Sequence, residues 1–262
     1  MAKSLSQTVL ITGASGGIGL ELAKMFAHEG YRLVLVARNG AKLEEIKKEL
    51  TRDYSASVEV VVKDLSVASA PRQIFDELQE KSIAIDVLVN NAGIGFFGFF
   101  AETDLACQEE LLRINVFSLT EMTHLFLKPM IERKEGKILN VASTAAFQPG
   151  PLMAVYYASK AYVLSFSEAL ANELSGSGVD VTVLCPGPTK TSFQQRANMI
   201  DSKLFKKHAM SAEEVAKIGY RGLLKKKLIV IPGLQNKLLA ASVRFAPRPL
   251  VTRMVRKVIS TH

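Results

Sequence analysis

Residues 12–19 read TGASGGIG, and the segments on either side give this glycine-rich stretch its meaning. Residues 8–11 form an apolar, β-branched run that predicts a strand, and residues 20–28 have the apolar spacing typical of a helix. A strand, a glycine turn and a helix in this order are typical of a dinucleotide site, because glycines let the backbone approach a pyrophosphate and the helix N-terminus supplies free N–H groups. The spacing of Gly13, Gly17 and Gly19 differs from the usual G-x-G-x-x-G, so a purely structural turn is the alternative.

The alternation of strands and helices continues along the chain. Strands are predicted at residues 8–11, 32–37, 58–62, 86–89, 136–141, 179–184 and 228–231. Helices are predicted at residues 20–28, 41–50, 70–80, 102–131 and 156–174. Strands separated by helices imply right-handed crossovers and a parallel sheet that is covered on both faces. We therefore expect an α/β, doubly wound Rossmann fold with a single seven-stranded parallel sheet.

The composition is typical of a globular protein. Of the 262 residues, 48% are hydrophobic and 22% are charged, which is enough apolar surface for a sizeable core. No apolar run approaches the ~20 residues of a membrane-spanning helix, and the first predicted strand begins too early to leave room for a signal peptide. Cys107 and Cys185 lie in segments that read as core, which favours reduced thiols and a cytoplasmic location.

The net charge of +8 is unevenly distributed. Residues 201–262 hold fourteen basic and three acidic side chains, whereas residues 1–200 hold nineteen basic and twenty-two acidic ones. The basic character therefore indicates a partner or a surface at the C-terminal end, and we expect no nucleic-acid partner. We expect a catalytic domain at residues 1–232 and a basic helical extension at residues 233–262, packed on the same domain.

The segment YYASK at residues 156–160 places a tyrosine and a lysine four residues apart, on one face of a predicted helix. A lysine beside Tyr156 would favour the phenolate and lower the pKa of the hydroxyl. Tyr156 would then be usable as a general acid or base near neutral pH. The alternative is an ordinary amphipathic helix on which Lys160 is a surface residue.

Small and amide residues follow the predicted strands at the edge where open α/β sheets bind ligands. The fourth strand runs into NNAG at residues 90–93, and the sixth into PGPT at residues 186–189. The strand at 32–37 is followed by Arg38 rather than by the carboxylate that holds the adenine ribose in NAD-binding folds, and arginine suits the 2′-phosphate of NADP. The alternative for Arg38 is a solvated loop residue.

Four phenylalanines within residues 96–100 lie beside this edge in the sequence. Such residues belong either to the core or to the wall of an apolar substrate pocket. We expect some of the four to do each.

Seven sequence features together resemble the short-chain dehydrogenase/reductase family in both order and spacing, over about residues 9–191. They are TGASGGIG (12–19), DL (64–65), NNAG (90–93), Asn115, Ser143, YYASK (156–160) and PGPT (186–189). The resemblance implies that Tyr156 exchanges the proton with the carbonyl or alcohol oxygen, and that Ser143 orients this oxygen. It implies that Lys160 binds the nicotinamide ribose and, together with the oxidised nicotinamide, lowers the pKa of Tyr156. It also implies that Asn115 holds a water that links Lys160 to solvent.

The resemblance also implies the cofactor-binding residues. Asp64 would contact adenine, Asn91 would support the adenosine ribose, and Thr189 would hold the carboxamide. Arg38 resembles the NADP-preferring pattern, although many such relatives also carry a basic residue where Gly16 stands. The full expected set is Gly13, Ser15, Gly16, Gly17, Ile18, Gly19, Arg38, Asp64, Leu65, Asn91, Ala92, Gly93, Tyr156, Lys160, Pro186, Gly187 and Thr189. We expect NADP(H) as the cofactor and no metal.

The function that these features favour is an NADP(H)-dependent oxidoreductase that interconverts a carbonyl and an alcohol on a small to medium apolar substrate. The alternative is a catalytically silent NADP-binding protein with a regulatory or interaction role. By analogy with many relatives, the helices at 102–131 and 156–174 would form a homodimer or homotetramer. The segment at 250–259 is a basic amphipathic helix that could lie on an anionic membrane. We expect its apolar face to pack on the domain or on a neighbouring subunit instead.

Overall fold

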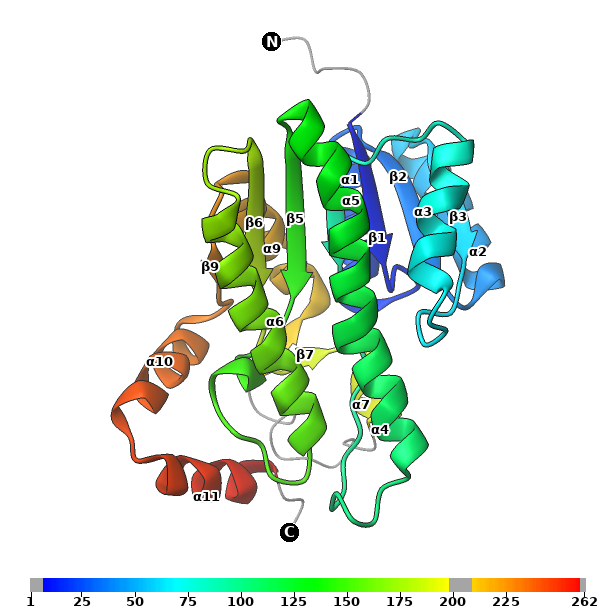
Figure 1. Ribbon diagram of the computed structural model, residues 1–262. Helices are drawn as coiled ribbons and strands as arrows, with labels where there is room; N and C mark the ends of the chain where they lie inside the picture. Colours follow the sequence, from blue (N-terminus) through cyan, green and yellow to red (C-terminus); the bar gives the residue numbers. More distant parts are fainter. Residues whose placement is uncertain (1–6, 198–208, 260–262) are drawn as a thin grey trace.

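The computed structural model describes residues 7–197 and 209–259 of the chain. Its main sheet has seven parallel strands, as predicted, and they follow the order β3-β2-β1-β4-β5-β6-β9 (Figure 1). The strands are β1 (Thr8–Thr12), β2 (Arg32–Ala37), β3 (Val58–Val62), β4 (Val87–Asn90), β5 (Gly136–Val141), β6 (Val179–Leu184) and β9 (Ile229–Val230). The strand order reverses direction between β1 and β4, so the crevice at their carboxyl ends is where this architecture binds ligands.

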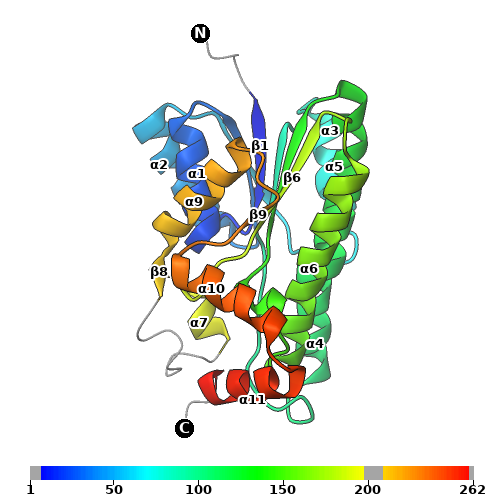
Figure 2. The same cartoon turned by 90° about the vertical axis from the view of Figure 1, so that its left-hand side faces the viewer.

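Helices cover both faces of the sheet, which Figure 2 shows edge-on. One face carries α1 (Gly17–His28), α2 (Gly40–Tyr54) and α9 (Ala212–Leu224), and the other carries α3 (Ala70–Glu80), α5 (Leu119–Arg133) and α6 (Ala154–Glu173). Side chains alternate between the two faces along each strand. In β1, for example, Val9 and Ile11 join the core under α1, and Leu10 joins the core under α3.

A chain of buried hydrogen bonds attaches the helices of the second face to the sheet. Asn90 at the end of β4 donates to Thr123 of α5 at 3.0 Å and to Asn140 of β5 at 2.9 Å. Asn140 in turn donates to Ser167 of α6 at 3.0 Å. Because buried polar groups must find partners, this chain selects one position of α5 and α6 on the sheet.

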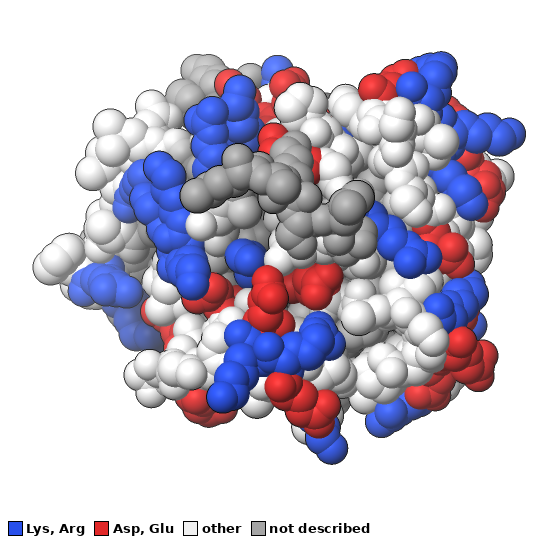
Figure 3. All heavy atoms as spheres, turned by 90° about the horizontal axis from the view of Figure 1, so that it is seen from above, with Lys and Arg blue, Asp and Glu red and all other residues white. Residues whose placement is uncertain are grey.

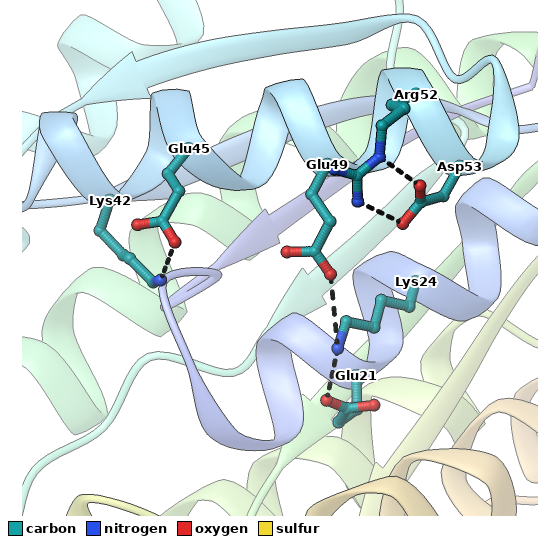
Figure 4. Close-up of polar contacts among 7 residues, drawn as sticks. All are labelled: Glu21, Lys24, Lys42, Glu45, Glu49, Arg52 and Asp53. Carbon is teal, nitrogen blue, oxygen red and sulfur yellow. Dashed lines mark hydrogen bonds and ion pairs between the residues drawn. The ribbon is translucent and has the colours of Figure 1, made fainter.

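Basic and acidic side chains are interspersed on the surface at one end of the sheet. Figure 3 shows the end of the molecule at the start of the strands, where basic and acidic side chains both occur. On the solvent side of α1 and α2, Lys24 pairs with Glu21 at 3.2 Å and reaches Glu49 at 3.9 Å (Figure 4). Such exposed pairs contribute little to stability.

The prediction of one helix at 102–131 is wrong in detail. The helix begins at Leu105, because the side chain of Asp104 caps it by accepting from the N–H of Ala106. It runs as α4 (Leu105–Leu112), passes through a π-helical turn, η1 (Arg113–Ser118), and continues as α5. A π turn holds one extra residue per turn and often occurs at functional sites.

Several elements were not predicted from the sequence. A separate pair of short parallel strands, β7 (Thr189–Lys190) and β8 (Met210–Ser211), lies beside the main sheet. The crossover to β9 is made by α9, whose N-terminus carries a capping box between Ser211 and Glu214. The 3-10 helix η2 (Thr144–Phe147) follows β5, and the short helix α7 (Phe193–Arg196) follows β7.

The C-terminal segment forms α10 (Leu234–Ser242), the 3-10 turn η3 (Val243–Phe245) and α11 (Arg248–Ile259). These helices lie at the carboxyl end of the sheet, and α11 runs across this end of the molecule in both ribbon views (Figures 1 and 2). Val251, Val255 and Ile259 of α11 are buried in a cluster with Met153 and Tyr157. No described helix is long and apolar enough to cross a membrane, and residues 260–262 lie outside the described chain.

The sheet contains one buried group whose replacement should increase stability. Thr182 in β6 is fully buried, and its hydroxyl has no hydrogen-bond partner among the described residues. Thr182→Val replaces this hydroxyl by a methyl group of the same size and should raise the free energy of unfolding by about 1 kcal/mol. Urea unfolding measures the difference. Thr182→Ser is the matched control, since it keeps the hydroxyl, loses the methyl and should be less stable than wild type. A loss of stability in Thr182→Val would contradict the assignment of an unpaired hydroxyl.

Candidate active site

A cavity of about 840 Å³ opens at the carboxyl end of the sheet, between the glycine turn after β1 and the C-terminal helices. It collects almost every residue that the sequence singled out. The predicted residues on its wall are Gly13, Ser15, Gly16, Gly17, Ile18, Arg38, Asp64, Leu65, Asn91, Ala92, Gly93, Ser143, Tyr156, Lys160, Pro186, Gly187 and Thr189. Gly19 and Asn115 are buried behind this wall.

The glycine turn needs its glycines for two physical reasons. Gly13 and Gly17 have φ angles of +67° and +56°, a region that L-residues with side chains rarely adopt. Gly19 is required for steric reasons, since a β-carbon there would lie 2.5 Å from the carbonyl oxygen of Gly13. The turn leads into α1, where Gly16 provides no side-chain cap. The free N–H groups of the first turn of α1 can therefore serve an anionic ligand.

Asn91, on the cavity wall, also fixes the glycine turn. Its side-chain amide donates to the carbonyl oxygens of Thr12, at 2.9 Å, and Gly13, at 3.2 Å. The hydroxyl of Thr12 accepts from the backbone N–H groups of Asn91 and Ala92 at 3.0 and 3.1 Å. These bonds fasten the end of β4 to the turn after β1, so the amide of Asn91 is already engaged by the protein.

The π turn brings Asn115 under the site. Its amide pairs with the backbone of Ile94, accepting from the N–H at 3.0 Å and donating to the carbonyl at 2.9 Å. It also donates to the hydroxyl of Ser159 at 3.1 Å. A β-carbon on Gly93 would be 3.3 Å from both Asn115 and the ammonium of Lys160, so these two side chains flank the same glycine. Asn115 thus links the end of β4 to the helix that carries Lys160.

Lys160 is buried, and its ammonium donates to the carbonyl oxygen of Val141 at 2.9 Å. Burial disfavours the charged amine and lowers the pKa of Lys160 to about 8. The ammonium lies 5.9 Å from the ring centroid of Tyr156.

Burial of Tyr156 raises its pKa to about 12, and the Ser143 hydroxyl opposes this rise only in part. In the chain alone the pKa of Tyr156 therefore lies above its ordinary value, opposite to the direction predicted from a lysine four residues away, because desolvation is the largest effect. The implied effect of Lys160 together with an oxidised nicotinamide stays a prediction. Ser143 is oriented by its neighbours, since its hydroxyl accepts from the N–H of Ala145 at 3.1 Å and donates to the carbonyl of Pro186 at 3.3 Å.

Arg38 and Asp64 form the opposite end of the cavity. The guanidinium of Arg38 lies 3.6 Å from the carboxylate of Asp64 and donates to Glu110 of α4 at 3.2 Å. Desolvation alone would raise the pKa of Asp64. Hydrogen bonds from Ser66 and the charge of Arg38 outweigh it and hold this pKa below its usual value. Glu110 is a neighbour that the sequence did not reveal, because no motif connects it to Arg38 across 72 residues.

The apolar wall of the cavity differs from the prediction. None of the four phenylalanines at 96–100 lines it. Phe96 and Phe97 pack against hydrophobic clusters, and Phe99 and Phe100 are exposed around a smaller hollow of about 120 Å³. The wall comes instead from Met153, Tyr157, Phe193, Val243, Val251, Met254, Val255 and Val258. Most of these residues belong to the C-terminal segment. Only the tertiary fold brings this segment to the site, so no local sequence pattern could have indicated it.

The buried amine should leave a signature in the pH dependence of stability. The pKa of Lys160 is about 8 in the folded chain, against an ordinary value of 10.5, so the unfolded state binds more protons between these values. The stability of wild type should therefore rise with pH relative to Lys160→Met, by about 2 kcal/mol between pH 8 and pH 10. Urea unfolding of both proteins across this range measures it. Loss of the hydrogen bond to Val141 in Lys160→Met shifts the stability difference between the two proteins by the same amount at every pH. A stability difference that does not change with pH would contradict the burial of a titrating amine.

Comparison with known proteins agrees with this geometry. Residues 7–200 match the short chain dehydrogenase family. The 17-beta-hydroxysteroid dehydrogenase type 3 of Mus musculus is 35% identical over 200 residues, which are 75% of this chain and 64% of that protein. The chain therefore spans less than two thirds of the length of this relative.

Solved structures resemble the chain over nearly its whole length. A short-chain dehydrogenase from Sphingobium yanoikuyae in complex with NADPH has a TM-score of 0.83 and 32% identity, covering 93% of this chain and 94% of that one. A 7beta-hydroxysteroid dehydrogenase has a TM-score of 0.86 and 26% identity, covering 95% of this chain and 96% of that one. The chain belongs to the short-chain dehydrogenase family.

Proposed function

We propose that this chain is an NADP(H)-dependent oxidoreductase that interconverts a carbonyl and an alcohol on a bulky apolar substrate. One observation carries the proposal. A single cavity has Tyr156, Ser143 and Lys160 on its wall, the glycine turn and Arg38 toward one end, and an apolar wall from the C-terminal helices. The polar part suits a dinucleotide, and the apolar part suits a substrate without charge.

The residues present fit a nicotinamide dinucleotide. The uncapped N-terminus of α1 and the glycines at 13 and 17 offer a close backbone approach to a pyrophosphate. At Gly17 a β-carbon would lie 3.0 Å from Thr191 across the cleft, so the cradle tolerates no side chain there. Arg38 would hold a 2′-phosphate, and Lys160 and Thr189 would serve the nicotinamide end.

When bound, the cofactor supplies or accepts the hydride. The chain's own groups then handle the proton and the substrate oxygen. Tyr156 would give a proton to the oxygen in reduction and take it in oxidation, and Ser143 would orient that oxygen. The ammonium of Lys160 would stabilise the phenolate as it forms, which counteracts the desolvation that otherwise keeps Tyr156 protonated. Asn115 would act as a positioning residue, because its amide holds Ile94 and Ser159.

The substrate class follows from the walls and from the relatives. Met153, Phe193 and Val255 present apolar surface beside Tyr156. The names of the mouse and the 7beta relatives refer to hydroxysteroids. We therefore propose a bulky ketone or secondary alcohol as the substrate. A catalytically silent role has less support, because Ser143, Tyr156 and Lys160 all remain on the cavity wall.

The location and assembly of the chain belong to the same proposal. A cytoplasmic location is supported by the absence of a disulfide within the described chain and by the buried Cys185, whose pKa burial raises to about 12. A homodimer or homotetramer is supported by the exposed apolar side chains of Leu105, Phe117 and Tyr162 on α4, η1 and α6.

The first test is Tyr156→Phe. It removes only the transferable proton, so turnover of an apolar ketone should fall at least a thousandfold while the affinity for NADPH stays within about threefold. Turnover is followed by NADPH absorbance, and cofactor binding by fluorescence titration. Tyr162→Phe is the matched control on the same helix, since its hydroxyl bonds Thr120 at the surface. Near-normal turnover in Tyr156→Phe would overturn the assignment.

Arg38→Ala tests the cofactor. Loss of a charged contact to the 2′-phosphate, worth ~1.5–3 kcal/mol, should weaken NADPH roughly ten- to more than hundredfold and leave NADH nearly unchanged. Isothermal titration with both cofactors measures the ratio. Glu110→Gln serves as a control that keeps Arg38 and its ion pair with Asp64 while removing the ion pair with Glu110. Equal affinity of wild type for NADPH and NADH would contradict the phosphate role.

A further inference from the structure

The outer side of α11 has a second apolar row that does not pack on the domain. Val251, Val255 and Ile259 form the buried row. One position before each of them stand Leu250, Met254 and Val258, which are 49%, 59% and 50% exposed. Residues four apart share a helix face, so these three form a continuous exposed stripe beside the buried one.

The neighbouring helix and turn extend this apolar surface. Leu234, Leu238 and Leu239 of α10 are each more than 60% exposed, and Phe245 of η3 is 88% exposed. Seven of the eighteen exposed large hydrophobic residues of the described chain thus fall within residues 234–258. We call these seven residues the rim patch. Exposed apolar side chains concentrated in this way mark an interaction surface.

The rim patch adjoins the active-site cavity. Leu239, Met254 and Val258 are half or more exposed and also line the cavity. They therefore lie where the cavity meets the outside. Whatever covers the rim patch also borders the opening through which a substrate would pass.

The segment that carries the rim patch has charges of a single sign. Residues 233–262 contain six lysines and arginines and no aspartate or glutamate. Within the described chain, Arg244, Arg248 and Arg253 form no ion pair. Arg256 lies over the ring of Phe99 at 5.4 Å, which connects α11 to the loop on the other side of the smaller hollow. The occupant of this surface should therefore combine apolar and anionic groups.

We propose that the rim patch is a docking surface for an anionic lipid bilayer, through which an apolar substrate enters the cavity. Apolar side chains flanked by arginines match the acyl–headgroup boundary of such a membrane. A second copy of this chain fits less well, because a symmetric contact would bring two basic, acid-free segments together. The route for the substrate rests on the proposed function, whereas the docking itself does not.

The test is sedimentation of the full chain with vesicles, without cofactor or substrate. One set contains phosphatidylcholine with 30% phosphatidylserine and the other phosphatidylcholine alone, each at about 20 and 150 mM salt. We expect binding to the anionic vesicles that weakens with salt, and little binding to the neutral ones. No binding to anionic vesicles at low salt, or equal binding to both kinds, overturns the proposal.

Matched variants locate the surface. Phe245→Ser with Leu250→Ser should weaken vesicle binding at least tenfold, whereas Leu224→Ser, at an exposed leucine on α9, should not. Arg253→Glu should weaken binding by roughly tenfold, whereas Lys227→Glu makes the same charge change beyond α9 and should have little effect. Binding that survives both rim-patch variants overturns the proposal. Phe245→Leu, which keeps an apolar side chain at this position, should bind vesicles like wild type. This result would show that the serine variants lose the apolar surface and not the fold.

Two further readouts separate this inference from others. Light scattering measures the oligomer size of wild type and of the double variant at Phe245 and Leu250. If wild type binds no vesicles and the double variant forms a smaller oligomer, the rim patch is a contact with a second copy of the chain. Turnover of a water-soluble ketone should be unchanged in these variants. If vesicles bind but no carbonyl compound is reduced, the docking stands and the proposed function fails. If ketones are reduced but vesicles do not bind, the proposed function stands and the docking proposal fails.

Discussion

The site depends on a buried lysine whose ammonium is held by one backbone carbonyl. Lys160 forms no ion pair within the described chain, and its ammonium donates to the carbonyl of Val141, the last residue of β5. Desolvating an ammonium is unfavourable. The bond to Val141 offsets part of this cost, and the remainder lowers the pKa of Lys160. The arrangement requires α6 to lie at one height along the sheet.

Buried amides and hydroxyls set that height. Asn140 of β5 bonds Ser167, which lies two turns beyond Lys160 on α6, and Asn90 of β4 bonds both Asn140 and Thr123. Asn115 adds a second attachment through Ser159, directly before the lysine. Each of these groups would be left unpaired if α6 slid along the sheet. The need to pair buried polar groups therefore positions the helix that carries Tyr156 and Lys160 more sharply than apolar packing can.

The cavity joins two kinds of surface that come from different parts of the chain. The turn after β1, the end of β4 and Arg38 form a polar part from the first hundred residues. The C-terminal helices α10 and α11 contribute much of the apolar part, with one row of α11 buried and the next exposed. The same helix thus closes the cavity wall and presents its outer stripe to the surroundings.

The sequence by itself determined the architecture. Strong β-branched runs, the glycine turn and the alternation of strands and helices predicted the seven parallel strands, because these signals are local and repeat with the period of each element. It also singled out Tyr156, Lys160, Ser143 and the cofactor-facing residues, since their spacing within a strand–turn–helix order is itself the signal.

Only the tertiary structure decided what depends on contacts between distant residues. The π turn at Asn115 results from its bonds to Ile94 and Ser159, which no local pattern encodes. Glu110 reaches Arg38 across the fold, and α11 rather than the phenylalanines at 96–100 walls the cavity. The raised pKa of Tyr156 has the same origin. The spacing of Tyr156 and Lys160 indicates a nearby charge, but the desolvation that raises the pKa comes from side chains brought together by folding.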